Sequence, residues 1–290
     1  MNSFVKFLVF FASFSLNASE LQKYRLVVGS MFKNEAPWLK EWIEYHRLLG
    51  VERFYLYNND SDDNYREVLD PYIEQNIVEL IEWDSKTAPW HKVTRKRHVG
   101  FQITAFNDCI KRALGKADWV AIIDSDEFIV PLPGVHALHT FLDRALQTNI
   151  GTLTFLWKLY GTSGVWNIPE GTLMTEALFM RKEDGGDYHP NTLGKCLHRP
   201  EAVEFCYLHS ARLKDGFRQT FIWDVRINHY VLRGLQETLQ KRCAIKIYDE
   251  QNLTPEALEC LNIMDENYNQ IEDRAIWPFL PALKKAMNFQ

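Results

Sequence analysis

The sequence lacks most of the short signatures that mark common nucleotide-binding enzymes. No Gly-x-Gly-x-x-Gly stretch follows the first expected strand, and no phosphate-binding P-loop is present. These absences argue against a dinucleotide-dependent dehydrogenase and against a P-loop kinase. The chain also has no internal repeat and no low-complexity linker. Its 290 residues therefore fit one large domain, or one domain with an appendage.

Cysteine pairs and clustered basic residues are scarce as well. None of the five cysteines forms a Cys-x-x-Cys pair, so neither a zinc site nor a redox motif is indicated. Cys196 and Cys206 would bridge if they lay on adjacent strands, which the sequence leaves open. The net charge of −5 argues against the clustered basic surface of a nucleic-acid-binding protein.

The amino-terminal stretch resembles a secretory signal peptide. Lys6 precedes an apolar run over residues 7–14, and the small residues Ala18 and Ser19 follow. The run is shorter than the ~20 residues that a transmembrane helix needs. We therefore expect residues 1–20 to be a leader that exports the protein or associates it with a membrane. The alternative is a cytoplasmic protein with a disordered or surface-packed leader.

Strands and helices are expected to alternate through the first half of the chain, which predicts a parallel sheet flanked by helices. The hydrophobic pattern indicates strands near residues 25–32, 51–57, 77–83 and 119–128, with helices at 34–50, 65–75 and 98–114. The second half is less regular. Its pattern indicates strands at 150–159, 173–181, 202–208 and 225–231, and a helix at 255–270.

The most informative stretch joins an apolar run to a group of carboxylates. Residues 119–123 are apolar and lead into Asp124, Asp126 and Glu127. In an extended chain, Asp124 and Asp126 would share a face at the carboxyl end of a buried strand, where α/β sheets bind ligands. Two carboxylates at such a short distance repel each other unless a cation lies between them. Mg²⁺ or Mn²⁺ suits such a pair. The alternative is a solvated acidic loop.

Several motifs in order resemble glycosyltransferase family 92 and its bacterial relatives, which are GT-A-type enzymes acting on nucleotide sugars. They are Lys-Asn-Glu-Ala-Pro-Trp-Leu-Lys-Glu-Trp-Ile-Glu-Tyr-His at 33–46, Gly-Val at 50–51 with Tyr-Asn-Asn-Asp-Ser at 57–61, Asp-Ser-Asp-Glu-Phe at 124–128 and Ile-Asn-His-Tyr at 227–230. The resemblance covers roughly residues 25–245. It implies a GT-A-like α/β fold over 21–245, with a mostly parallel, Rossmann-like sheet flanked by helices. Residues 21–130 would form the nucleotide-sugar-binding half, 131–245 a more irregular acceptor-binding half, and 246–290 a C-terminal helical appendage.

The resemblance also assigns roles to individual residues. Asp124 and Asp126 match the Asp-x-Asp motif that holds a divalent ion, Mn²⁺ first and Mg²⁺ second, against the donor diphosphate. His229 would be a third metal ligand. Side chains expected to contact a UDP-sugar donor are Asn34, Glu35, Asn58, Asp60, Arg97 and Lys195, with helix capping or an Asx turn as structural alternatives for the two asparagines. Inversion needs a general base, and the sequence does not choose among Glu127, Asp187, Asp224 and His209.

The expected function is therefore metal-dependent transfer of a sugar from a nucleotide sugar to a hydroxyl of a glycan or other acceptor. The family implies inversion, with galactose as the sugar in its characterised members. A metal-dependent phosphoester hydrolase or nucleotidyl transferase would use the same carboxylates. A non-catalytic carbohydrate-binding protein is the alternative from another class.

Overall fold

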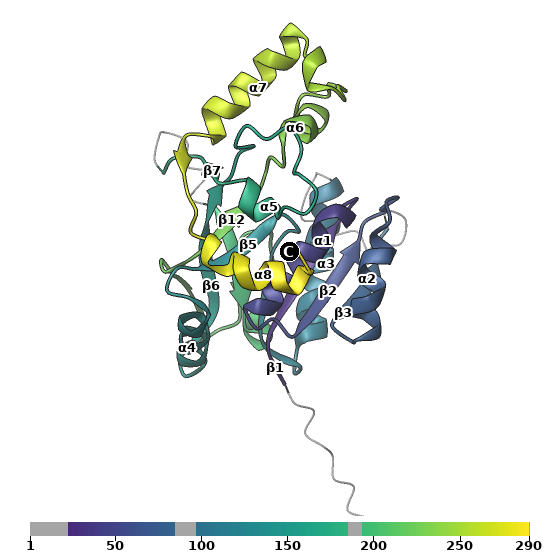
Figure 1. Cartoon of the computed structure of the whole chain (residues 1–290). Coiled ribbons are helices and arrows are strands. Elements are labelled where there is room, and N and C mark those ends of the chain that lie inside the picture. The colour runs from purple at the N-terminus through teal and green to yellow at the C-terminus, as the bar shows by residue number, and fades with distance from the viewer. Residues whose placement is uncertain (1–22, 85–96, 185–192, 290) are drawn as a thin grey trace, which may run out of the picture.

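The structure is a computed structural model that describes residues 23–84, 97–184 and 193–289 (Figure 1). The expected leader at 1–20 and the base candidate Asp187 lie outside these ranges. Within them, no helix has both the length and the apolar character needed to cross a membrane.

A nine-stranded sheet forms the centre of the described part of the chain, in the order β3-β2-β1-β4-β8-β6-β12-β5, with β11 beside β6. Strands β3, β2, β1 and β4 are parallel, β8 runs antiparallel between β4 and β6, and β5 is antiparallel to β12. The predicted α/β fold with a mostly parallel sheet is confirmed. The strands are β1 (Tyr24–Phe32), β2 (Arg53–Asn58), β3 (Val78–Glu82), β4 (Ala117–Ile122), β5 (Glu127–Pro131), β6 (Ile150–Leu159), β8 (Gly194–His198), β11 (Arg218–Phe221) and β12 (Val225–His229).

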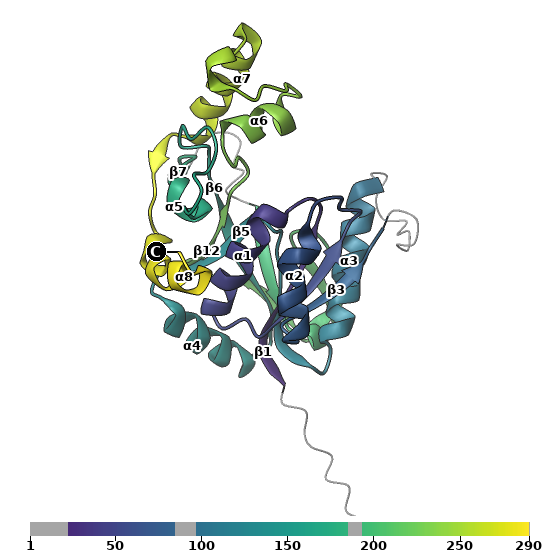
Figure 2. The same cartoon turned by 45° about the vertical axis from the view of Figure 1, so that its right-hand side comes forward.

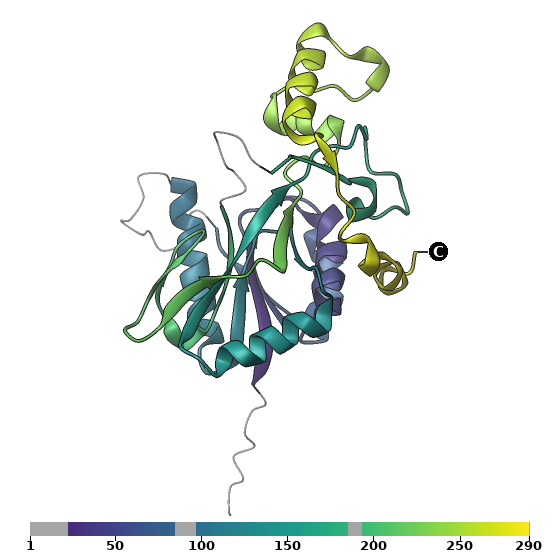
Figure 3. The ribbon, with the colours of Figure 1, turned by 90° about the vertical axis from the view of Figure 1, so that its left-hand side faces the viewer.

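Helices cover both faces of the parallel half of the sheet (Figure 3). Alternation along β1 decides which side chain faces which helix: Val28 joins the core under α1 (Ala36–Leu48) and α2 (Tyr65–Glu74), and Val27 joins the core under α3 (Arg97–Ala113). Gly29 lies directly beneath α3, where an added Cβ would come within 2.3 Å of the Cys109 sulfur. A fourth helix, α4 (Val135–Leu146), follows β5 and was not predicted.

Helix α1 holds the edge strand β5 through buried polar side chains. Trp42 Nε1 donates to the carbonyl of Glu127 at 2.8 Å, and Tyr45 Oη donates to that of Ile129 at 2.8 Å. His46 Nδ1 donates to the Trp42 carbonyl, and its Nε2 accepts from the Ile129 amide. These three side chains of the 33–46 motif thus fix the backbone directly after the Asp-Ser-Asp stretch.

Acidification below pH 6.5 is expected to destabilise the fold through His46. Burial lowers the pKa of His46 from 6.5 to about 3, so the unfolded chain binds a proton that the folded chain does not. The stability that the neutral imidazole contributes is full above pH 6.5 and is lost as pH falls towards 3, at up to ~1.4 kcal/mol per pH unit.

The measurement is the free energy of unfolding between pH 7 and pH 4.5. His46→Gln should reduce its pH dependence, the remainder coming from His198, whose pKa burial also lowers to about 3. His136→Gln, at an exposed position, is the matched control. An equal slope in the wild type and in His46→Gln would contradict the assignment.

The predicted strand over 173–181 is wrong. Residues Met174–Ala177 form the short helix α5, and only β7 (Met180–Arg181) is extended. The cause is Glu41, whose buried carboxylate accepts the backbone N–H groups of Met174 at 2.8 Å and Thr175 at 3.0 Å. Those donors begin a helix, and their acceptor lies 133 residues away for Met174, beyond the reach of a local pattern.

The predicted appendage at 246–290 also needs correction. Helices α6 (Leu235–Arg242) and α7 (Pro255–Tyr268) form a small lobe that projects from the sheet, as Figure 2 shows. A disulfide between Cys243 and Cys260 joins them, and Cys196 and Cys206 are free and buried. The chain then returns: β13 (Ile271–Glu272) pairs with β7, and α8 (Leu280–Met287) packs against α1. The segment after α7 is therefore part of the main body. A small hairpin, β9 (Val203–Cys206) and β10 (Ala211–Leu213), completes the fold.

Candidate active site

The Asp-Ser-Asp stretch is a turn between two strands, not the end of one continuous strand. β4 ends at Ile122 and β5 begins at Glu127, and the two strands lie at distant positions in the sheet order. The Glu127 amide donates to the Asp124 carbonyl at 3.1 Å, and Glu127 Oε2 accepts the Asp124 amide at 2.8 Å. These two hydrogen bonds close a turn. The chain is therefore not extended here, as the predicted shared face of Asp124 and Asp126 requires. The turn still lies at the carboxyl end of a central strand.

Asp124 is paired with a buried lysine. Lys195 Nζ lies 2.7 Å from Asp124 Oδ2, and Gln102 of α3 donates to Oδ1 at 2.7 Å. Lys195 is 1% exposed and its ammonium lies near the rings of Phe106 and Trp157. Burial disfavours the charged form, but the carboxylate of Asp124 raises the pKa of Lys195 above its ordinary value. Lys195, which was predicted to contact the donor, instead neutralises the charge of Asp124 in this structure.

Asp126 faces His229 at the end of β12. Asp126 Oδ2 and His229 Nε2 are 3.4 Å apart. Although burial opposes both charged forms, each group stabilises the other: the pKa of Asp126 is held well below its ordinary value, and that of His229 is raised. The Asp126 carbonyl also accepts the Tyr230 amide at 2.9 Å, which fixes the turn against β12. Sequence and structure agree in bringing these two residues together.

Glu127 is fully enclosed beside this pair. Its Oε1 lies 3.7 Å from His229 Nδ1, and neither atom has a hydrogen-bond partner in the described part of the chain. Burial raises the pKa of Glu127 to about 7, against the opposing effect of Lys195. With no exposed surface, Glu127 closes the turn and does not face an acceptor.

Of the two remaining base candidates, His209 and Asp224, only His209 lies near this group of residues. His209 lies edge-on to Trp157, and its Nδ1 is hydrogen-bonded to the Gly194 carbonyl. Burial lowers the pKa of His209. Asp224 is exposed and precedes β12 at the opposite end from His229, so the structure does not bring it to this group.

Most predicted donor-binding residues are engaged in holding loops together. Asn34 Oδ1 accepts the Asp62 amide at 2.9 Å, which is a link between loops and not the expected helix cap. Asn58 is buried and bonds the Ser61 amide and Glu82. Asp60 is exposed at the carboxyl end of β2, with a positive φ of 55°. Arg97 begins α3, and its side chain lies outside the described atoms.

Glu35 forms a bidentate ion pair that sequence reasoning missed. Arg233 donates through both terminal nitrogens to the Glu35 carboxylate, with Nη2–Oε1 at 2.8 Å. Both side chains are buried, and 198 residues separate them along the chain. Arg233 also lines a cavity of about 260 Å³ together with Asp126, Glu237, Lys241 and Arg242. The pair therefore anchors one wall beside Asp126.

A divalent ion fits at Asp126 and His229. In the described residues, no three His, Cys, Asp or Glu side chains converge to hold a metal by themselves. One or two protein carboxylates suffice where substrate phosphates complete the coordination. The 3.4 Å between Asp126 Oδ2 and His229 Nε2 suits two ligands of one ion, each ~2.1 Å from it. Asp124 fits less well, because Lys195 and Gln102 already bond both of its oxygens.

Comparisons with known proteins agree on one family. The sequence model of glycosyltransferase family 92 matches residues 25–278. A family 92 protein of Oryza sativa subsp. japonica is 30% identical over 240 residues, covering 79% of this chain and 37% of its own length. One of Ricinus communis is 28% identical over 239 residues, covering 79% and 40%. The chain thus spans about two fifths of the length of these curated plant relatives.

Two further similarities are more distant. Beta-1,4-galactosyltransferase galt-1 of Caenorhabditis elegans is 29% identical over 114 residues, which cover 38% of this chain and 26% of that protein. The crystal structure of S. aureus TarS 1-349 in complex with UDP aligns with a TM-score of 0.41 at 12% identity, covering 92% of this chain and 72% of the other. The match over residues 25–278 shows that this chain belongs to glycosyltransferase family 92.

Proposed function

We propose that this protein transfers a sugar from a UDP-sugar to a hydroxyl of a glycan acceptor, with inversion at the anomeric carbon. Family membership supports glycosyl transfer. A relative named a beta-1,4-galactosyltransferase makes galactose the first sugar to test. The observation that carries the proposal is the approach of His229 to Asp126 in the turn after β4, beside the carboxyl ends of β1 and β2.

In this proposal Asp126 and His229 hold a divalent ion, and the imidazole favours Mn²⁺ over Mg²⁺. The ion, when bound, stabilises the negative charge of the departing nucleoside diphosphate. The chain's own residues set the electrostatics around it. Lys195 neutralises Asp124, so this carboxylate repels the diphosphate less, and Glu127 fixes the turn by accepting the Asp124 amide.

The donor's nucleoside is proposed to lie over the carboxyl ends of β1 and β2, because those ends and the Asp-Ser-Asp turn share one edge of the sheet. Asp60, exposed at the carboxyl end of β2, is proposed to contact the nucleoside. Asn34 and Asn58 would act indirectly, by holding the loop that carries Asp60.

Export is proposed on separate grounds. A disulfide persists in oxidising compartments, and Cys243–Cys260 therefore supports the expectation drawn from residues 1–20. Protein recovered from its native source should begin near Ser19 or Glu20 and carry this disulfide, as intact-mass measurement would show. An unprocessed Met1 on cytosolic protein would refute export and any membrane association that depends on it.

Transfer is tested by UDP release from UDP-galactose and other UDP-sugars with Mn²⁺, with and without a glycan mixture. Release that requires the glycans, with a product heavier by one hexose, supports the proposal. Equal release without glycans would indicate a hydrolase. Binding without turnover would indicate a carbohydrate-binding protein.

A further inference from the structure

A cavity of about 530 Å³ lies where His229 meets the α6–α7 lobe. Its volume is within the ~300–1,000 Å³ typical of small-molecule sites. Trp157 and His229 line it from the sheet, Arg242 from the end of α6, and Asn267 and Tyr268 from α7. It therefore belongs to both the sheet and the lobe.

The cavity adjoins the proposed donor site without coinciding with it. Val231, Leu232 and Arg242 line both this cavity and the 260 Å³ cavity that contains Asp126. His229 contacts Asp126 and also lines the larger cavity. A molecule bound there would lie beside the group proposed to hold the donor diphosphate. On the proposed function, that is the place of the acceptor.

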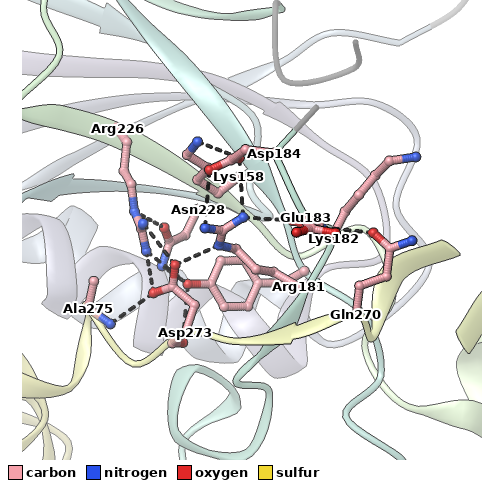
Figure 4. A network of polar contacts seen from close by, with 11 residues as sticks. Lys158, Arg181, Lys182, Glu183, Asp184, Arg226, Asn228, Gln270, Asp273 and Ala275 are labelled. Atoms are coloured by element: carbon pink, nitrogen blue, oxygen red, sulfur yellow. Dashed lines mark hydrogen bonds and ion pairs between the residues drawn. The ribbon is translucent and has the colours of Figure 1, made fainter. Parts of the chain in front are cut away.

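The lining is positively charged although the whole chain is negative. Lys182 and Arg242 line the cavity, and none of the described residues that line it is a carboxylate. Asp184, two residues from Lys182, is already shared by Lys158 and Arg181. Figure 4 shows the Lys182 side chain extending away from that network. Arg242 is positioned by a hydrogen bond from Nη2 to the Val231 carbonyl at 3.2 Å.

The cavity also has two aromatic residues in its lining. Trp157 is 9% exposed, and its indole N–H has no acceptor in the described part of the chain. Tyr268 adds a second ring.

The disulfide fixes the wall that α7 contributes. Cys260, Met264, Asn267 and Tyr268 follow each other at intervals of four, three and one, so they lie on one face of the helix. Cys260 bonds Cys243, which directly follows Arg242. One covalent link thus orients both the α7 face and the arginine of the cavity.

We propose that this cavity is the acceptor site and that it takes an anionic glycan. A sugar ring packs against Trp157 and Tyr268, and its carboxylate, phosphate or sulfate group faces Lys182 and Arg242. The identification of this ligand as the acceptor rests on the proposed glycosyl transfer. The preference for a charged glycan is measured without any donor, so its failure and the failure of the proposed function can be distinguished.

The test compares three matched probes by titration calorimetry. They are maltohexaose, maltohexaose with a 6-phosphate on its terminal glucose, and maltohexaose with that glucose oxidised to glucuronic acid. At least one charged form should bind about tenfold tighter than the neutral form, and the difference should shrink in 0.5 M NaCl because the attraction is screened. The two charged arms separate phosphate from carboxylate as the preferred group.

Variants assign the effect to the cavity. Lys182→Met and Arg242→Met should each remove most of the preference for the charged probe, and Lys285→Met, at an exposed position of α8, should leave it intact. Tyr268→Ala should weaken all three probes alike, because it removes a lining ring that the charged and neutral probes share. Thermal unfolding checks that each variant is folded. Equal binding of the three probes, no binding at millimolar concentration, or an unchanged preference in both Met variants would overturn the proposal.

Discussion

Asp126→Asn is expected to reduce sugar transfer at least ~100-fold while leaving the fold intact. The ion that Asp126 is proposed to hold contributes several kcal/mol to charge stabilisation in the transition state, and each 1.36 kcal/mol is tenfold in rate. Asp126 is 23% exposed at its side chain and packs in a surface turn, so asparagine fits the same space. The measurement is UDP release in the presence of acceptor, with Mn²⁺ at saturation.

Two controls make this result specific. Asp143→Asn removes an exposed carboxylate on α4 and should leave the rate unchanged. Asp124→Asn is expected to lower the melting temperature as well as the rate, because it leaves the buried Lys195 ammonium short of its partner. Full activity in Asp126→Asn would remove the basis for the proposed ion site.

The largest effect on stability is expected from Asp273→Asn, at about 3–5 kcal/mol lost from the free energy of unfolding. Asp273 bonds Arg226 of β12 at 2.6 Å and Arg181 of β7 at 2.6 Å, as Figure 4 shows. All three side chains are nearly buried, with exposures of 9–11%. Breaking a buried pair from one side leaves uncompensated charge. Here the Arg226 guanidinium would lose its carboxylate partner, whereas Arg181 would keep Asp184.

The change would also release the segment that follows the lobe. Asp273 precedes α8, and Arg226 lies on β12 three residues before His229. Tyr160 and Asn228 complete the same network. Glu272→Gln is the matched control, because its 56%-exposed carboxylate pairs with Arg274 at the surface, and such pairs contribute ~0–1 kcal/mol.

The pH dependence gives an independent check on Asp273. Burial opposes its charged form, but the hydrogen bonds from Arg226 hold its pKa well below the ordinary 3.8. A depressed folded-state pKa means stability that is present above pH 3.8 and is lost as pH falls below it. Chemical denaturation of the wild type should show this loss, and Asp273→Asn should lack it. Equal stabilities of the two proteins would contradict the network's importance.

The first half of the fold was predictable because each of its elements buries one regular face. β1, β2, β3, α2 and α3 lie within a few residues of their expected positions. The exception is residues 119–128. Ile122 and Phe128 are both buried, so apolar character alone did not reveal the turn of Asp124–Glu127 between β4 and β5.

The contact between the predicted metal ligands could be predicted from the sequence, and the ion pairs around them could not. Asp126 and His229 meet as the motifs implied. The pairing of Lys195 with Asp124 and of Arg233 with Glu35 joins residues 71 and 198 positions apart, for which no local spacing exists. The lobe was missed for a similar reason, since a disulfide and the small core of Leu239, Ala257 and Leu261 hold it.

The proposed ion and donor site is tested most directly by thermal unfolding of the wild type and Asp126→Asn with UDP and a panel of UDP-sugars, with and without Mn²⁺. A ligand that binds only the folded state raises the free energy of unfolding, by ~2.7 kcal/mol at 100 times its dissociation constant. The melting temperature therefore rises with the ligand concentration. If Asp126 holds the ion that binds the donor diphosphate, at least one of these nucleotides stabilises the wild type, and this stabilisation requires Mn²⁺ and is lost in Asp126→Asn. The absence of any stabilisation of the wild type at millimolar nucleotide, or an equal shift in the variant, would contradict this assignment.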